Sequence, residues 1–169
     1  KASEAGTKLH YDIECFYNSI ATENTSKEYL QFLDFHKKIG ETLKPYRTEW
    51  TVFDEDIQIS GSIDMVFQDA DGSLLIYDWK RSKAIKKQNM WECATTECIN
   101  HLPNSNFWHY SLQLNTYKKI LERKYGKIVS GLFLVVLHPN QDSWKRIKVP
   151  ILENEMKDLF ELRLAEKME

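Results

Sequence analysis

The sequence predicts an α/β fold with elements in the order α-α-β-β-β-α-β-β-α. Three observations lead to this prediction. Apolar residues recur at helical spacing near both ends of the chain. Between residues 61 and 80, two apolar runs flank an acidic turn that contains glycine, as in a β-hairpin. Residues 128–137 form a continuous apolar run, which is typical of a buried strand.

The first part of the chain predicts two helices. Apolar residues at helical spacing cover 7–20, and Thr7 is placed to cap the start of that helix. A second helical pattern covers 27–43, with Ser26 as its N-cap. The second helix carries no candidate site residue, so we expect it to serve packing.

Strand patterns follow these helices. Residues 47–53 alternate between two faces, with Glu49 on the face opposite Trp50. The acidic residues 54–56 predict a solvated turn, which leads into the central hairpin at 61–80.

The composition changes after Lys80. Residues 81–109 are first basic and then polar, and they predict an irregular insertion of a length that is often functional in a compact domain. The remaining predicted elements are a helix at 110–125, the buried strand at 128–137, an edge strand at 144–149 and a closing helix at 151–168.

The composition is that of an ordinary globular protein, with 42% hydrophobic and 28% charged residues among 169. This length fits a single domain over 1–169, and the lack of an initial Met leaves open that the chain is a fragment whose partners include other domains. The apolar runs are shorter than a membrane span, so we expect no membrane partner. The three cysteines cannot pair evenly, which favours reduced thiols and an intracellular setting.

The net charge of −2 hides an uneven distribution. Lys and Arg strongly outnumber Asp and Glu between residues 80 and 148, whereas the rest of the chain is acidic. A basic region directly after the hairpin favours a polyanionic partner such as a nucleic acid. The alternative is that most of these charges are solvated on helices and loops.

The end of the hairpin carries the candidate chemistry. Alternate strand residues share a face, so Asp78 and Lys80 point the same way and Trp79 points the other way. Asp64 lies on the paired strand and can reach the same edge. Two carboxylates beside an amine suit a cation such as Mg²⁺ and a phosphodiester substrate, because this ion takes oxygen ligands and polarises phosphoryl oxygens. The alternative is a hairpin with exposed, solvated charges.

Four short motifs follow one another along the chain: Gly6-Thr7-Lys8-Leu9-His10, Gly61-Ser62-Ile63-Asp64, Asp78-Trp79-Lys80 and Gln113-Leu114-Asn115-Thr116-Tyr117. In this order they resemble the motifs of the PD-(D/E)XK nuclease superfamily. The most similar branch is the RecB-like and lambda-exonuclease-like one, which includes the mitochondrial genome maintenance exonucleases. The resemblance covers most of the chain and implies a restriction-endonuclease-like core, in which helices flank a mixed central β-sheet.

The resemblance also implies roles for individual residues. Mg²⁺ or Mn²⁺ would be bound by His10, Asp64, Asp78 and the backbone carbonyl of Trp79. Lys80 would orient or activate the attacking water, and Gln113 and Tyr117 would bond that water or the substrate phosphate. Glu14 and Glu49 would lie near the site rather than on the metal.

We therefore expect a metal-dependent deoxyribonuclease that processes single-stranded DNA or DNA ends in replication, repair or recombination. One alternative is an RNA endonuclease of the kind found in viral transcription machinery, and the Gln113/Tyr117 pair argues against it. A second alternative is a nuclease-fold module that binds DNA without cleaving it. The intact Asp64, Asp78 and Lys80 argue against such a module.

The expected insertion contains two further groups of residues. Three have the spacing of a partial metal site: Cys93, Cys98 and His101. They are one cysteine short of the iron–sulfur clusters of some family members, and we assign them no role. Four aromatic residues in the insertion and at the start of the helix that follows it are candidates either for stacking on unpaired bases or for the core: Trp91, Phe107, Trp108 and Tyr110.

Overall fold

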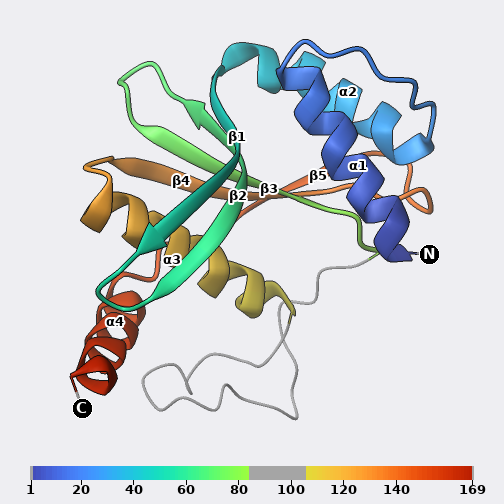
Figure 1. Cartoon of the computed structure of the whole chain (residues 1–169). Helices are drawn as coiled ribbons and strands as arrows, with labels where there is room; N and C mark the ends of the chain where they lie inside the picture. Colours follow the sequence, from blue (N-terminus) through green and yellow to red (C-terminus); the bar gives the residue numbers. More distant parts are fainter. Residues whose placement is uncertain (1, 84–105, 169) are drawn as a thin grey trace.

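Five strands form one mixed sheet at the centre of the computed structural model, which describes residues 2–83 and 106–168 (Figure 1). The strands are β1 (Lys44–Asp54), β2 (Ile59–Gln68), β3 (Leu74–Lys80), β4 (Val129–Val136) and β5 (Lys145–Lys148). They lie side by side in this order, with β3 and β4 parallel and all other neighbours antiparallel. The predicted α/β fold with a mixed sheet is therefore confirmed.

Two layers of helices cover the sheet (Figure 1). One layer consists of α1 (Ala2–Tyr17) and α2 (Lys27–Lys38), which is followed by the short 3₁₀ helix η1 (Gly40–Thr42). The other consists of α3 (Asn106–Lys124) and α4 (Glu153–Lys167). The order of helices and strands agrees with the prediction, and Ser26 caps α2 as expected. Among the described residues, no helix combines the length and the apolar character that a membrane span requires.

Each helical layer buries an apolar cluster against the sheet. Leu9 and Phe32 of the α1/α2 layer pack with Trp79 of β3. Ile120 of the α3/α4 layer packs with Ile76 of the same strand. Alternate residues of β3 thus enter opposite clusters, and the strand is buried up to its last residue. The end of β3 lies where both layers of helices can reach it.

The turn between β1 and β2 differs from the prediction. Asp54 is fully buried and accepts a hydrogen bond from Arg123 Nε of α3 at 2.9 Å. Glu55 and Asp56 both pair with Lys124. The expectation of a solvated acidic turn is wrong for Asp54, because the basic end of α3 packs against the turn.

Two helices begin earlier than predicted. The first helix already starts at Ala2, so Thr7 lies inside α1 and does not cap it. The third helix starts at Asn106, so the last residues of the insertion expected at 81–109 are helical. Its early start has a packing reason, because Phe107 is buried in the cluster between the sheet and the α3/α4 layer.

Candidate active site

The backbone of Trp79, next to the end of β3, contacts residues of two other elements. Its N–H donates a hydrogen bond to Asp64 Oδ2 of β2 at 3.0 Å. Its carbonyl oxygen lies 2.8 Å from His10 Nε2 of α1, at hydrogen-bond distance. The indole ring is buried and packs edge-on against Phe32 and Phe35. The buried ring fixes the strand end, and the strand backbone in turn orients Asp64 and His10.

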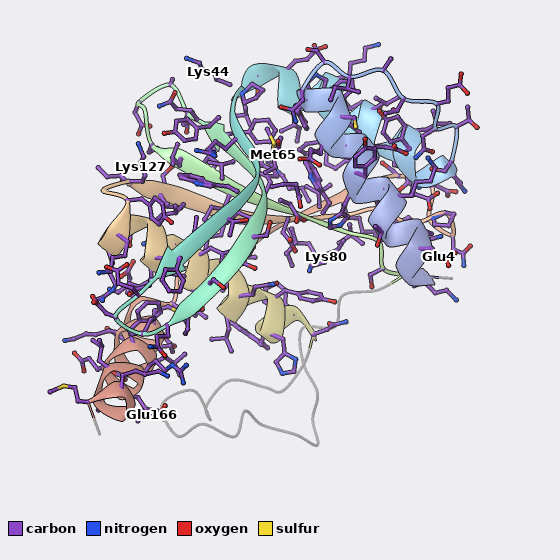
Figure 2. All side chains as sticks on the ribbon, viewed as in Figure 1. Glu4, Lys44, Met65, Lys80, Lys127 and Glu166 are labelled. Carbon is purple, nitrogen blue, oxygen red and sulfur yellow. The ribbon has the colours of Figure 1, made fainter. Side chains whose placement is uncertain are left out.

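Asp78 and Lys80 lie on either side of Trp79 and share the opposite face of β3, as the alternation predicts. Lys80 Nζ lies 2.8 Å from Asp78 Oδ2. Figure 2 shows Lys80 between α1 and the beginning of α3. Asp78 Oδ2 is buried and receives no hydrogen bond of good geometry from the described residues. This oxygen therefore keeps a lone pair for a further ligand.

Glu49 of β1 approaches the same point. Glu49, His10 and Asp64 each offer one ligand atom, and these atoms all lie within 4.8 Å of one another. The backbone of Glu49 has a φ of 43°, in the left-handed region that few residues other than glycine adopt. Strain of this kind is concentrated at functional sites. Glu49 therefore belongs to the side chains able to hold an ion, a role that the sequence analysis did not give it.

Gln113 and Tyr117 of α3 form the side of the site that faces the second helical layer. Gln113 Nε2 donates a hydrogen bond to Tyr117 Oη at 2.9 Å, which confirms that the two side chains share a helix face. The Tyr117 ring lies against Gly61 of β2, where a Cβ atom would overlap Tyr117 Cε1. Tyr117 is buried, whereas Gln113 is exposed and can reach a substrate.

Burial and like charges set the electrostatics of the carboxylates. Burial, and next the charge of Asp78, raise the pKa of Asp64 well above its usual value. Burial also raises the pKa of Glu49, and the neighbouring Glu14 and Asp78 carboxylates add to the effect. In the absence of a cation, burial disfavours the charged form of both carboxyl groups, and repulsion between the acidic groups adds to this effect.

The two basic groups of the site respond in opposite ways. Burial lowers the pKa of His10, although the Asp78 carboxylate partly opposes the shift. Burial alone would also lower the pKa of Lys80, but the adjacent Asp78 carboxylate outweighs it and the pKa of the amine is raised. Lys80 is therefore a permanent cation near neutral pH, whereas the His10 imidazole is neutral and available as a ligand.

The site fits a hard divalent cation. Carboxylates and a backbone carbonyl are ligands that Mg²⁺ and Mn²⁺ prefer, and an imidazole is acceptable to Mn²⁺. Glu49 and Asp64 lie beside His10, and Asp78 lies beside Asp64 and pairs with the Lys80 ammonium. A cation among them would bind the free lone pair of the Asp78 oxygen that pairs with Lys80. It would also offset the burial and the like charges that raise the pKa of Asp64.

The predicted site residues meet at this strand end: His10, Asp64, Asp78, Trp79, Lys80, Gln113 and Tyr117. Of the aromatic candidates, Phe107 belongs to the core, Trp108 and Tyr110 pack partly against it, and Tyr110 also contacts Lys80. The other candidates of the insertion lie outside the described residues: Trp91, Cys93, Cys98 and His101.

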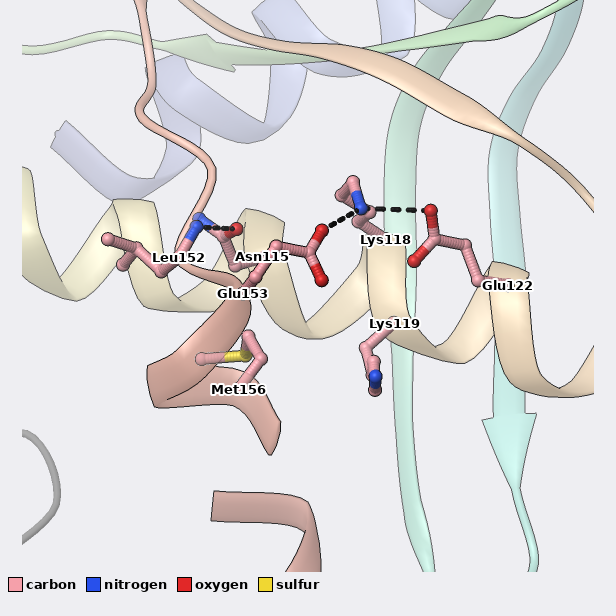
Figure 3. A pocket seen from close by; sticks show the side chains of 7 residues that line it. All are labelled: Asn115, Lys118, Lys119, Glu122, Leu152, Glu153 and Met156. Atoms are coloured by element: carbon pink, nitrogen blue, oxygen red, sulfur yellow. Dashed lines mark hydrogen bonds and ion pairs between the residues drawn. The ribbon is translucent and has the colours of Figure 1, made fainter. Parts of the chain in front are cut away.

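A charged depression over α3 and α4 is separate from this site (Figure 3). Lys118 Nζ donates hydrogen bonds to Glu122 at 2.8 Å and to Glu153 at 2.7 Å. The depression has no interior space for a water molecule. Its charged groups therefore join two helices and do not form a ligand site.

The fold and the strand-end cluster define a restriction-endonuclease-like α/β domain. The model of the PD-(D/E)XK nuclease superfamily matches residues 5–169, and the chain belongs to this superfamily. No curated protein is significantly similar to the chain.

Two solved structures are similar to the chain. One is a candidate exonuclease from Eubacterium rectale, with 10% identity, a TM-score of 0.51 and an alignment that covers 94% of this chain and 63% of that one. The other, SSO0001, has 13% identity and a TM-score of 0.36, and the alignment covers 96% and 86% of the two chains. The likeness to the Eubacterium protein concerns the fold alone, and the chain spans less than two thirds of that protein's length.

Proposed function

We propose that the protein is a metal-dependent deoxyribonuclease that hydrolyses phosphodiester bonds, as expected of the RecB-like branch. One observation carries the proposal. Asp64, Asp78 and Lys80 meet beside His10 at the end of β3, in a chain that belongs to a nuclease superfamily. A module that only binds DNA has no need for this combination of buried charges, which is costly to maintain without a catalytic role.

A divalent cation is the proposed cofactor, either Mg²⁺ or Mn²⁺. The groups that would hold it are His10, Glu49, Asp64, Asp78 and the carbonyl of Trp79. When bound, such an ion polarises a phosphoryl oxygen and lowers the pKa of a coordinated water.

Lys80 acts in this proposal as a hydrogen-bond donor rather than as a base. Its raised pKa keeps the amine protonated at neutral pH. The ammonium can therefore orient the attacking water through the water's lone pair, or stabilise the negative charge that develops on the phosphate. The exposed amide of Gln113 is placed to bind the same phosphate, and Tyr117 holds that amide in position.

The proposed substrate is single-stranded DNA or a DNA end, processed inside the cell during replication, repair or recombination. The excess of Lys and Arg between residues 80 and 148 supports a polyanionic substrate. Several of these residues, among them Lys118, Arg123 and Lys124, pair with acidic side chains, so the support comes from the others. The choice of single strands and ends rests on the resemblance of the four motifs to the RecB-like branch.

The decisive experiment is a cleavage assay with labelled single-stranded DNA, duplex DNA and RNA in the presence of Mn²⁺. We expect Lys80→Ala to lower the DNA cleavage rate by roughly 10²–10³-fold, the usual cost of removing one preorganised donor. DNA affinity should change little, and Lys38→Ala, which alters an exposed lysine of α2, should cleave normally. Equal rates for Lys80→Ala and wild type would reject the role of Lys80.

The same assay separates the alternatives. Preferential cleavage of RNA would indicate the RNA endonuclease, and binding of DNA without cleavage under any divalent cation would indicate the non-catalytic module.

A further inference from the structure

Tyr110 of α3 contacts the Lys80 ammonium. Lys80 Nζ lies 4.1 Å from the centroid of the Tyr110 ring and 2.8 Å from Asp78 Oδ2. The Lys80 side chain is only 20% exposed, so both contacts are made largely out of water. The ammonium is thus held by one carboxylate and one aromatic face.

The two partners act on the amine in different ways. The negative face of an aromatic ring attracts a cation, and the attraction is stronger where water is excluded. A lysine has a flexible stem with many rotamers, so each additional partner reduces the positions that the amine visits. The ring therefore restricts the amine to the side of the site that faces α3.

The position of Tyr110 on α3 connects it with the other site residues of that helix. Tyr110, Gln113 and Tyr117 are spaced at i, i+3 and i+7, which places all of them on one helix face. Gln113 bonds Tyr117, and Tyr110 contacts Lys80. One face of α3 thus supplies a hydrogen-bonding amide and two aromatic rings to the end of β3.

We propose that Tyr110 is a positioning residue whose ring holds the Lys80 amine where it meets the attacking water or the phosphate. This inference rests on the proposed function. The contact matters most when Asp78 also serves as a metal ligand, because a carboxylate shared with a divalent cation attracts an ammonium less strongly. The ring has no such competing partner and keeps the amine in the site.

Two other roles fit the contact less well. Tyr110 does pack partly against the core between the sheet and the α3/α4 layer, but core packing alone does not account for the contact of its ring with an ammonium. A ring that only stacked on an unpaired base would not need the ammonium that lies over one of its two faces.

The test compares Tyr110→Leu, which removes the aromatic face, with Tyr110→Phe, which keeps it. Single-turnover cleavage of single-stranded DNA with Mn²⁺ gives the rate of the bound complex, and DNA titration in EDTA gives the affinity. We expect Tyr110→Leu to lower the rate by roughly 10–100-fold at unchanged affinity, because a displaced catalytic group costs about this much. Tyr110→Phe should cleave like wild type, and so should the control His109→Leu, which alters an exposed residue of α3.

A measurement without metal reports the contact itself. In protein labelled with ¹³C-lysine, the ε-methylene protons of Lys80 should show an upfield ring-current shift in EDTA. The signal is assigned by its loss in Lys80→Ala. The shift should persist in Tyr110→Phe and disappear in Tyr110→Leu. Thermal unfolding checks that each variant folds, and Tyr110→Met replaces Tyr110→Leu if the leucine variant does not.

The outcomes separate this inference from the proposed function. If the wild type cleaves no DNA, both the proposed function and this inference fail. The positioning role alone is overturned if Tyr110→Leu cleaves as fast as wild type while Lys80→Ala does not. It is also overturned if Tyr110→Phe is as slow as Tyr110→Leu, or if Tyr110→Leu weakens DNA binding without slowing the bound complex.

Discussion

At the scale of single residues, Gly61 determines where Tyr117 can lie. A Cβ atom at position 61 would overlap Tyr117 Cε1, so any side chain there must displace the ring. Gln113 would move as well, because its amide is bonded to the Tyr117 hydroxyl. The glycine is therefore required by the close approach of α3 to β2 rather than by a turn.

We expect Gly61→Ala to lower the free energy of unfolding by about 1–3 kcal/mol, the usual cost of overpacking a core site. Urea unfolding measures the change, and the cost should shrink in a Tyr117→Ala background, where the ring is absent. Gly6→Ala is the matched control, because a Cβ there meets nothing within 4 Å, and it should be neutral or slightly stabilising in helix α1. Equal costs in both backgrounds would show that Tyr117 is not the obstacle.

Glu49 shows the limit of prediction at this scale. Strand alternation gave the face on which Glu49 lies, but its approach to His10 and Asp64 coincides with a φ of 43°. Its neighbours Thr48 and Trp50 are β-branched and aromatic, and such residues indicate a regular strand. The sequence therefore contains no sign of the unusual backbone conformation at Glu49. By contrast, the sequence predicted that Asp78 and Lys80 share a face, because this follows from the period of any strand.

At the scale of secondary-structure elements, hydrogen bonds of Asn115 fix the approach of α4 to α3. Asn115 Nδ2 donates to the carbonyl of Pro150 at 3.0 Å, and its Oδ1 accepts from the N–H of Leu152 at 2.8 Å. Lys118 reinforces the junction through its bond to Glu153, as Figure 3 shows. The buried amide thus satisfies two backbone groups of the segment that leads into α4.

Asn115→Ala should destabilise the protein by about 2–3 kcal/mol, because the buried N–H of Leu152 and the carbonyl of Pro150 lose their partners. Chemical denaturation measures this loss. Asn154→Ala makes the same change at an exposed position of α4 and should have little effect. A loss of stability no greater than that of Asn154→Ala would mean that water or a shifted chain replaces the lost bonds.

The order of elements was predictable because apolar periodicity depends on local sequence. The boundaries that were missed depend on distant partners instead. Asp54 is buried because Arg123 lies across it, and α3 begins at Asn106 because Phe107 enters the core. Neither contact can be inferred from the neighbouring sequence, because each depends on a partner in another element of the fold.

At the scale of the whole molecule, the site depends on the sheet and on both helical layers. His10 comes from α1, Asp64 and Asp78 from neighbouring strands, and Gln113 from α3. The four sequence motifs predicted which residues would meet, but the separation of their atoms depends on how the layers pack. Cation binding should therefore be coupled to the stability of the entire domain.

The raised pKa of Asp64 determines how the stability of the metal-free protein changes with pH. In the metal-free protein, the native state holds the Asp64 proton at pH values above 3.8, where the unfolded chain has released it. The native state then binds more protons than the unfolded state, so this group makes the free energy of unfolding fall as the pH rises. The lowered pKa of His10 acts in the opposite direction, but only below its usual value of 6.5.

We therefore expect Asp64→Asn to be more stable than wild type in EDTA near neutral pH, by about 1–2 kcal/mol, a typical gain when a strained site is relieved. Mn²⁺ should reverse the order. At a concentration 100-fold above its Kd, an ion that binds only the native state adds roughly 2.7 kcal/mol, which corresponds to a Tm increase of about 5–10 °C in the wild type.

Asp64→Asn should lose most of that increase, whereas Asp69→Asn, in the exposed turn between β2 and β3, should keep it. Differential scanning calorimetry in EDTA and in Mn²⁺ measures both effects. A Tm increase in Asp64→Asn as large as that of the wild type would place the ion elsewhere. An EDTA stability no higher than that of the wild type would show that Asp64 is not strained by its neighbours. If both results are as expected, the Asp64 carboxylate lowers the stability of the metal-free domain and is also required for the stabilisation that the bound ion provides.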